Sequence, residues 1–148
     1  MGMAGLRVGY LLAHPELAAQ ISKAKLPYNV NQFSLTAAEV ALEHIDRFRP
    51  PIEAVLKERS RLGEELARLP GVKVYPSEAN FFLVEVPVAP RTIFDDLYSH
   101  GILIRDVSSY PMLSKCLRIS VGTQEENDRL LSVLRTSLAK QAAGAGSE

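Results

Sequence analysis

Hydrophobic and polar residues alternate along residues 117–121, as they do in a strand that buries one face. Leu117, Ile119 and Val121 fall on one side of this segment, while Arg118 and Ser120 fall on the other. Shorter apolar runs predict three further strands, at residues 72–75, 80–86 and 102–105. The fixed charge of Arg118 in the middle of a half-buried strand calls for a partner on the second face.

Segments whose apolar residues have helical spacing occur before, between and after these predicted strands along the chain. It predicts helices over residues 16–25, from residue 34 or 36 to the prolines at 50 and 51, over 51–69, over 91–99, and from 123 to about 140. Asn31 or Ser34 can cap the second helix. Thr123 and Glu126 have the spacing of a capping box, which predicts the start of the last helix.

The order of these elements divides the chain into unequal parts. Residues 51–140 follow the order β-β-α-β-β-α, which predicts an α+β fold with helices on one face of a small sheet. Residues 1–50 begin with one apolar strand, at residues 6–13, and continue with helices. A lone strand is not stable by itself, so we expect it to dock on another structure or to pair within an oligomer. Residues 141–148 are predicted to be disordered.

The bulk composition excludes several classes of partner. Lys plus Arg and Asp plus Glu number 17 each among 148 residues, so the net charge is zero, which argues against a nucleic-acid partner. No apolar run approaches the length needed to cross a bilayer, so no membrane partner is expected. One cysteine cannot form an internal disulfide, which suits a cytoplasmic protein.

Most familiar catalytic and metal-binding patterns are missing from the sequence. His14, His44 and His100 are far apart and have no metal-ligand spacing with Cys116, so we expect no metal site. Cys116 opens an apolar strand and is interpreted as a core residue. Neither of the common glycine-rich phosphate-binding motifs is present.

Three arginines remain as candidates for chemistry. Arg7, Arg105 and Arg118 lie at the start, at the end and in the middle of predicted strands. A guanidinium group offers a planar fork of donors that matches a carboxylate or a phosphate. The alternative is that each side chain extends into water or pairs with an acid such as Asp106. Spacing alone leaves both interpretations open.

Five motifs in order favour the first interpretation. They are AGLRVGY at 4–10, LPYNVNQ at 26–32, PSEANFF at 76–82, GILIRD at 101–106 and CLRISVGT at 116–123. This set resembles the C-terminal part of the histidinol-phosphate aminotransferases, which are fold-type-I enzymes that depend on pyridoxal 5'-phosphate. The resemblance covers about residues 2–140, and it is specific because the five motifs occur in one order at fitting separations.

The resemblance assigns roles to the three arginines. It implies that Arg7 binds the phosphate of pyridoxal 5'-phosphate. It implies that Arg118 receives the α-carboxylate of the substrate or of glutamate, and that Arg105 contacts the phosphate of histidinol phosphate. The family reaction is amino transfer between histidinol phosphate and 2-oxoglutarate, a step of histidine biosynthesis.

The resemblance also places three uncharged polar residues near the site. Tyr28 and Asn29 belong to a loop that the family holds near the active site and the subunit interface. Asn80 is expected close to the same cleft, without a specified role. Since such aminotransferases form homodimers, a second copy of the chain is a possible partner. By the same resemblance, residues 1–50 are the remnant of a large domain and residues 51–140 are the small C-terminal domain.

One departure from the family pattern limits what this chain can do. The family carries the lysine that binds the cofactor covalently in a Ser-Lys pair just before the AGLR motif, and only Met1–Gly5 precede Leu6 here. The pairs at Ser22-Lys23 and Ser114-Lys115 lack that context. We therefore expect a truncated aminotransferase with no catalytic residue and no covalently bound cofactor, inactive by itself.

Other functions remain open on the sequence alone. The same motifs suit another aromatic or phosphate-handling aminotransferase, or a threonine-phosphate decarboxylase. A non-enzymatic module could use Arg105 and Arg118 to bind an anionic amino acid for regulation. An interaction protein could use the long helices to pair with a partner chain.

Overall fold

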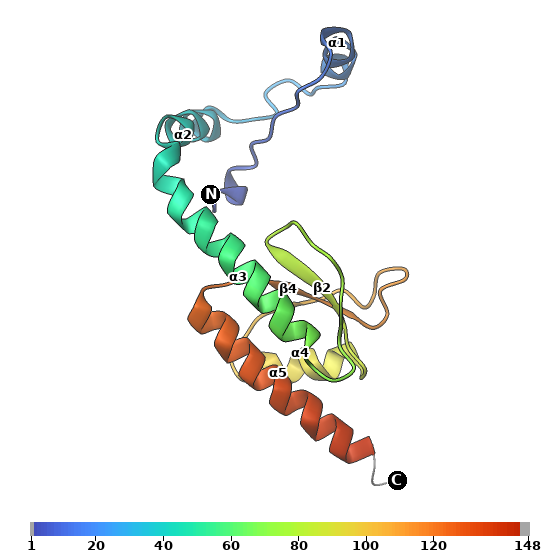
Figure 1. Ribbon diagram of the computed structural model, residues 1–148. Helices are drawn as coiled ribbons and strands as arrows, with labels where there is room; N and C mark the ends of the chain where they lie inside the picture. The colour runs from blue at the N-terminus through green and yellow to red at the C-terminus, as the bar shows by residue number, and fades with distance from the viewer. Residues whose placement is uncertain (1, 146–148) are drawn as a thin grey trace. The chain divides into compact units, whose positions relative to one another are not determined.

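Two separate units make up the computed structural model, which describes residues 2–145 (Figure 1). The first unit is Met1–Ile52 and the second is Glu53–Glu148. The first contains η1 (Ala4–Leu6), α1 (Pro15–Lys23), α2 (Gln32–Glu43), η2 (Ile45–Phe48) and the start of α3 (Arg49–Ala67). The second contains the rest of α3, then β1 (Lys73–Val74), β2 (Phe81–Glu85), α4 (Pro90–Ser99), β3 (Arg105–Asp106), β4 (Cys116–Ser120) and α5 (Gln124–Ala145).

Local signals account for the helices of the first unit. Pro15 occupies the first turn of α1, where its missing N–H has no helical acceptor to lose. Asn31, rather than Ser34, caps α2: its side-chain oxygen accepts a hydrogen bond from the Ser34 backbone N–H at 2.9 Å. Short-range bonds of this kind form without help from distant parts of the chain.

The strand predicted at residues 6–13 is wrong. The structure has the short helix η1 at Ala4–Leu6 and no regular element from there to α1. The segment is exposed to water, including Tyr10 and Leu12, whose exposed fractions are 89% and 87%. A strand needs a neighbouring strand to satisfy its backbone groups, and the described part of Met1–Ile52 contains none.

The second predicted helix does not reach the two prolines: α2 ends at Glu43, and the prolines belong to the start of α3. Pro50 and Pro51 lie in the first turn of α3, where a missing N–H costs no helical hydrogen bond. The one-turn helix η2 fills the gap between α2 and α3. At its other end α3 is followed by Gly71, whose φ of +73° is a left-handed conformation that favours glycine.

The sheet of the second unit is antiparallel throughout, with the order β1-β2-β4-β3. The two central strands are also the longest, with Phe81 opposite Ser120 and Glu85 opposite Cys116. The edge strand β3 begins at Arg105, three residues after the predicted start of that strand. All four predicted strands of this unit are present.

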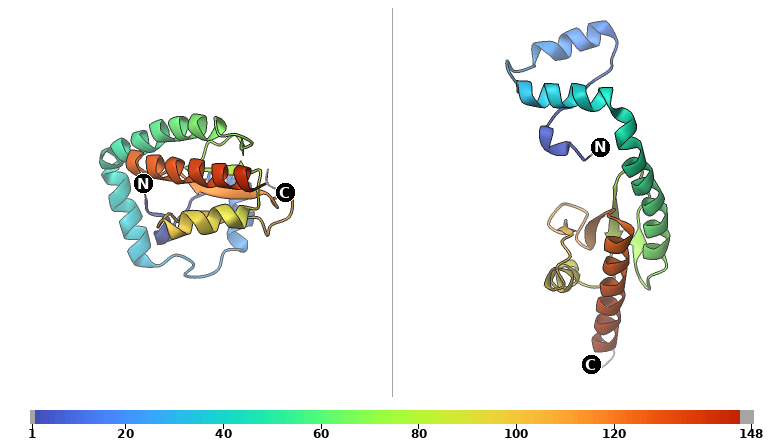
Figure 2. Two further views of the ribbon diagram at one scale, coloured as in Figure 1. Left: turned by 90° about the horizontal axis from the view of Figure 1, so that it is seen from below. Right: turned by 90° about the vertical axis from the view of Figure 1, so that its left-hand side faces the viewer.

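Three helices cover one face of the sheet, as the sequence predicts (Figures 1 and 2). The part of α3 that belongs to the second unit lies beside α5, and α5 lies between α3 and α4. Their apolar side chains meet those of β2 and β4 in one core, whose members are less than 2% exposed at Leu62, Leu66, Val84, Val86, Ile93, Leu97, Leu117, Ile119 and Leu134. This core fixes the position of the sheet.

The predicted capping box is present at the start of α5. The Thr123 backbone N–H donates to Glu126 Oε2 at 2.8 Å, and the Glu126 N–H donates to Thr123 Oγ1 at 3.3 Å. The helix continues to Ala145 rather than ending near residue 140, so the predicted disorder does not hold for residues 141–145. The remainder of the predicted tail, residues 146–148, lies outside the described residues.

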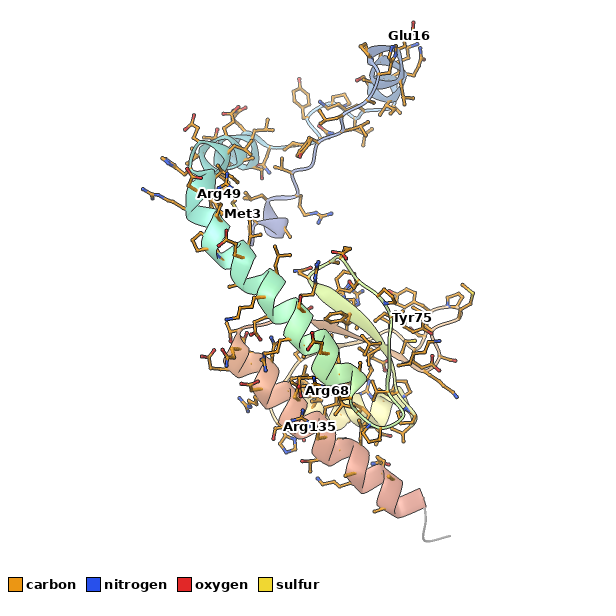
Figure 3. All side chains as sticks on the ribbon, viewed as in Figure 1. Met3, Glu16, Arg49, Arg68, Tyr75 and Arg135 are labelled. Carbon is orange, nitrogen blue, oxygen red and sulfur yellow. The ribbon has the colours of Figure 1, made fainter. Side chains whose placement is uncertain are left out.

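Ion pairs join α3 to α5 along their contact. Glu65 on α3 pairs with Arg68, which directly follows that helix, and with Arg135 on α5. Figure 3 shows Arg68 and Arg135 at the same end of this helix pair. Arg61 on α3 donates to Asp128 on α5 at 2.6 Å. These ion pairs hold α3 and α5 together on one face of the sheet. The candidate site lies on the opposite face.

Candidate functional site

The face of the sheet that the helices leave uncovered carries the candidate site. Along β2, Phe82 and Val84 point into the core, so Phe81 and Leu83 belong to the uncovered face, where both are half-buried. Along β4, Leu117 and Ile119 are buried and Arg118 takes the uncovered side, as the alternation predicts.

Two arginines face each other on this surface. The register of β3 on β4 puts Arg105 directly opposite Arg118. Side chains in opposite positions of an antiparallel pair have their Cβ atoms about 5 Å apart, and like charges there destabilise the sheet. Neither arginine takes part in the ion pairs formed among residues 2–145. An anion bound between them would remove that repulsion.

The acid that could have neutralised Arg105 is engaged elsewhere. The Ser108 backbone N–H donates to Asp106 Oδ1 at 2.9 Å. Hydrogen bonds from Ser108 lower the pKa of Asp106, so that its carboxylate stays ionised while bound to this turn. The alternative in which Asp106 simply pairs with Arg105 is therefore not what the structure shows.

The guanidinium group of Arg118 lies over the ring of Phe81, with 4.9 Å from its Cζ to the ring centroid. Its Nε is buried and has no hydrogen-bond partner among the described residues. The two terminal nitrogens are not buried in this way. Arg118 thus lies against the Phe81 ring, with its two terminal nitrogens available to a ligand.

A second group of polar side chains lies further along the same face. Tyr75 donates its hydroxyl to Glu85 Oε2 at 3.0 Å, and Lys73 Nζ lies 4.7 Å from the centre of the Tyr75 ring. Tyr75 lies on the side of the sheet away from α3 and α5 (Figure 3). Cys116 is opposite Glu85, and burial raises the pKa of its thiol, followed by the charge of Glu85. Cys116 is therefore a protonated core residue rather than a nucleophile.

The turn after β4 is held by a buried polar cluster. Asn127 on α5 accepts a hydrogen bond from the Gly122 N–H at 3.0 Å and donates to the Gly122 carbonyl at 3.1 Å. It also donates to Glu58 Oε2 at 2.9 Å, and Glu58 in turn binds Arg61. Arg61, followed by Asn127, lowers the pKa of Glu58. The cluster fixes the end of the strand that carries Arg118.

Asn80, the third predicted site residue of this unit, lies at the end of the same ladder. Its backbone carbonyl accepts a hydrogen bond from the Val121 N–H at 2.9 Å, and the residue is exposed. It directly precedes Phe81. The structure thus brings Asn80, Arg105 and Arg118 to one sheet, with the two arginines in direct opposition.

The other three predicted site residues belong to Met1–Ile52. Arg7 and Tyr28 have φ values of +55° and +56°, a left-handed conformation that costs a residue with a side chain about 1 kcal/mol or more. Tyr28 is fully exposed, and its neighbour Asn29 lies at the rim of a pocket of about 560 Å³ that Leu11 and Ile21 also line. The structure describes the positions of Arg7, Tyr28 and Asn29 within Met1–Ile52, and not relative to the second unit.

Sequence reasoning missed Phe81 and Tyr75 as members of the candidate site. Both occur in runs that were identified as strands, but which residue of one strand faces which residue of the next is not visible in the sequence. The sequence also does not show that Arg105 on β3 lies opposite Arg118 on β4, because 13 positions separate the two residues.

Two further observations concern metal ligands and membrane-spanning helices. No three His, Cys, Asp or Glu side chains among the described residues come together as metal ligands. None of the helices within residues 2–145 combines the length and the apolar character that crossing a bilayer requires.

The chain matches known proteins over most of its length. Residues 1–134 match the family described as aminotransferase class I and II. Histidinol-phosphate aminotransferase 1 of Burkholderia lata is 40% identical over 139 residues, which are 93% of this chain and 39% of that protein. The histidinol-phosphate aminotransferase of Aquifex aeolicus has the same identity and coverage. The chain therefore spans about two fifths of the length of these curated relatives.

Solved structures agree with this match. The histidinol-phosphate aminotransferase of Sinorhizobium meliloti, in complex with pyridoxal-5'-phosphate, has a TM-score of 0.76 at 30% identity, covering 95% of this chain and 39% of that one. The L-threonine-O-3-phosphate decarboxylase of Porphyromonas gingivalis has a TM-score of 0.80 at 29% identity, covering 93% and 43%. The match over residues 1–134, with the similarity to these relatives and structures, shows that this chain belongs to the class I and II aminotransferase family.

Proposed function

We propose that this chain forms the C-terminal part of an enzyme that transfers an amino group between histidinol phosphate and 2-oxoglutarate. The observation that carries the proposal is the opposition of Arg105 and Arg118 on an uncovered sheet face, where neither forms an ion pair with another of residues 2–145. Both substrates are anions, with carboxylate or phosphate groups that suit guanidinium forks. In this proposal Arg118 binds a carboxylate and Arg105 binds the phosphate of histidinol phosphate.

Residues 1–50 are proposed to belong to the cofactor-binding domain and residues 51–140 to the small domain. Arg7 fits the phosphate of pyridoxal 5'-phosphate, because it is exposed and takes part in no ion pair among the described residues. When bound, the cofactor supplies the electron sink for amino transfer. Tyr28, Asn29 and Asn80 are proposed to contribute to substrate binding.

Neither lysine of the two Ser-Lys pairs fits covalent attachment of the cofactor. Lys23 lies in α1 and donates to Gln20 Oε1 at 2.8 Å. Lys115 directly precedes β4, and its carbonyl accepts a hydrogen bond from the Val86 N–H. We expect no turnover when the 148-residue chain is mixed with pyridoxal 5'-phosphate, glutamate and the keto form of the substrate. Clear turnover would contradict the proposed division of roles.

A chimera tests the assignment of Arg105 and Arg118. In it, residues 2–134 of this chain replace the matching segment of the Burkholderia lata relative. We expect amino transfer from histidinol phosphate, with Arg105→Gln raising the KM for the phosphorylated substrate and Arg118→Gln impairing the half-reaction with 2-oxoglutarate, because histidinol phosphate itself carries no carboxylate. The control is Arg47→Gln, an exposed arginine of the first unit. An active chimera that is indifferent to Arg105 and Arg118 would contradict the assignment.

Phosphorylated amino-acid decarboxylation is the second candidate, since the Porphyromonas gingivalis structure is as similar to this chain as the aminotransferase is. Threonine phosphate carries a carboxylate and a phosphate in one molecule, whereas histidinol phosphate supplies the phosphate and 2-oxoglutarate the carboxylates, so the paired arginines suit both reactions. Release of carbon dioxide from threonine phosphate by the corresponding chimera, without transfer to 2-oxoglutarate, would favour this candidate. The proposal includes a cytoplasmic homodimer, and sedimentation of the chimera as a monomer at high concentration would remove the dimer from it.

A further inference from the structure

Phe81 occupies a specific place beside Arg118. Leu83 on β2 is directly opposite Arg118 on β4, so Phe81, two residues earlier, is the diagonal neighbour on the same face. An aromatic side chain can reach a diagonal neighbour, and the guanidinium carbon of Arg118 lies 4.9 Å from the centre of the Phe81 ring. This distance falls within the range of a cation–π contact.

The contact has a consequence for the three nitrogens of Arg118. Its Nε is buried without a hydrogen-bond partner among residues 2–145, whereas neither terminal nitrogen shares that condition. A ligand that approaches from solvent therefore meets the two terminal nitrogens first. A carboxylate can accept one hydrogen bond from each of them and so bind end-on.

We propose that Phe81 is a positioning residue that holds the Arg118 guanidinium flat and directs its two terminal nitrogens at a carboxylate. The inference rests on the proposed function, in which Arg118 is the carboxylate-binding residue. A long arginine side chain has many rotamers in water, and a ring beneath it reduces the number that must be given up on binding. Phe81 itself does not touch the ligand in this arrangement.

A merely structural role for Phe81 predicts something different. Phe81 is half-buried at the end of β2, so its replacement could also loosen the sheet. A loosened sheet would lower stability without a specific signal at Arg118. The experiment must therefore read the environment of the guanidinium separately from the folding of the chain.

Nuclear magnetic resonance of the 15N-labelled 148-residue chain provides that reading. The Nε–Hε signal of Arg118 is assigned by its loss in Arg118→Gln, and succinate serves as the carboxylate probe. In the unchanged chain we expect an upfield Hε shift from the ring current of Phe81 and saturable binding of succinate. In Phe81→Leu we expect the upfield shift to vanish and the Kd for succinate to rise about threefold to tenfold.

Two further variants control the result. Phe81→Tyr retains the ring and should restore both the shift and the affinity. Phe94→Leu removes a comparable contact, in which the Arg91 guanidinium lies 5.0 Å from the centre of the Phe94 ring on α4, and should leave succinate binding unchanged.

The outcomes separate this inference from the proposed function. Equal succinate affinity in the unchanged chain and Phe81→Leu, with binding lost in Arg118→Gln, overturns the role of Phe81 alone. An Hε signal without an upfield shift in the unchanged chain does the same, and needs no variant to fold. Absence of saturable binding, or equal binding by Arg118→Gln, overturns the proposed function and the inference together.

Discussion

The two units of this chain differ in whether their large apolar side chains are exposed or buried. In the first unit the described residues include only two buried side chains, those of Ser34 and Ala41. Large apolar side chains such as Leu12, Tyr28 and Phe33 are at least 78% exposed there. In the second unit, three helices and a sheet close around a core of leucines, isoleucines and valines.

The difference shows which structures a chain can form locally. The helices α1 and α2 exist without a core because their hydrogen bonds and caps come from residues a few positions away. The apolar run at residues 6–13 does not become a strand, because its partners would have to come from elsewhere. Most of the free energy that stabilises folding against chain entropy comes from burial, so we assign the stability of this chain to Glu53–Glu148.

The sharpest test replaces one leucine in each unit. Leu62→Ala removes a side chain that is fully buried, and we expect a loss of about 3 kcal/mol in the free energy of unfolding. Leu12→Ala removes a side chain that is 87% exposed, and a change within about 0.5 kcal/mol is expected. Urea unfolding followed by circular dichroism measures both. Similar losses would mean that the first unit also has a core.

Carboxylates provide the next test. Glu58→Gln breaks the pair with Arg61, and we expect a loss of about 2 kcal/mol at pH 7, less than for a fully buried pair because Arg61 is 33% exposed. The matched change in the first unit, Asp46→Asn, breaks the exposed pair with Arg49 and should cost less than about 1 kcal/mol.

The pH dependence of Glu58→Gln has a defined sign. Arg61 lowers the pKa of Glu58 below its ordinary value of 4.5, so folding favours the ionised carboxylate. The contribution of the ionised Glu58 carboxylate to stability is complete above its ordinary pKa. It is lost as the pH falls through the lower pKa that Glu58 has in the folded chain. The stability difference between the unchanged chain and Glu58→Gln should therefore shrink below about pH 4.5. A difference that stays constant down to pH 2 would contradict this linkage.

Replacement of two glycines by alanine is expected to change the stability of the chain by a smaller amount. A Cβ atom at Gly63 would lie 2.9 Å from Cζ of the Phe82 ring, so Gly63→Ala should lose about 1–2 kcal/mol despite the better helix propensity of alanine. A Cβ atom at Gly9 in the first unit would meet nothing within 4 Å, and Gly9→Ala should be nearly neutral. Thermal unfolding compares them, and a stabilised Gly63→Ala would show that the Phe82 ring can move aside.

The smallest expected effect is a gain. Ser137 on α5 is 1% exposed, and its hydroxyl has no hydrogen-bond partner among the described residues. Ser137→Ala should raise the free energy of unfolding by about 1 kcal/mol. Ser132→Ala, at an exposed position of the same helix, measures the gain from helix propensity alone. Equal gains would show that the hydroxyl of Ser137 finds a partner in solution.

The sequence located the candidate site only in part. Alternation placed Arg118 on the face opposite Leu117 and Ile119, because side-chain direction along a strand depends on local geometry. It could not show that Arg105 is the residue opposite Arg118, or that Phe81 lies beneath the guanidinium. Both facts depend on the register between strands, which the packing of the whole sheet decides.

The sequence by itself indicated the five α-helices, though not where α2 ends, the capping box of α5, the four strands of the second unit, and the family to which the chain belongs. These follow from short-range periodicity and from motifs that keep their order. Only the tertiary structure decided that residues 6–13 form no strand, that β3 begins at Arg105, and that two arginines meet on an uncovered face. Such features depend on pairing between segments far apart in the chain, and a sequence read one segment at a time does not contain that pairing.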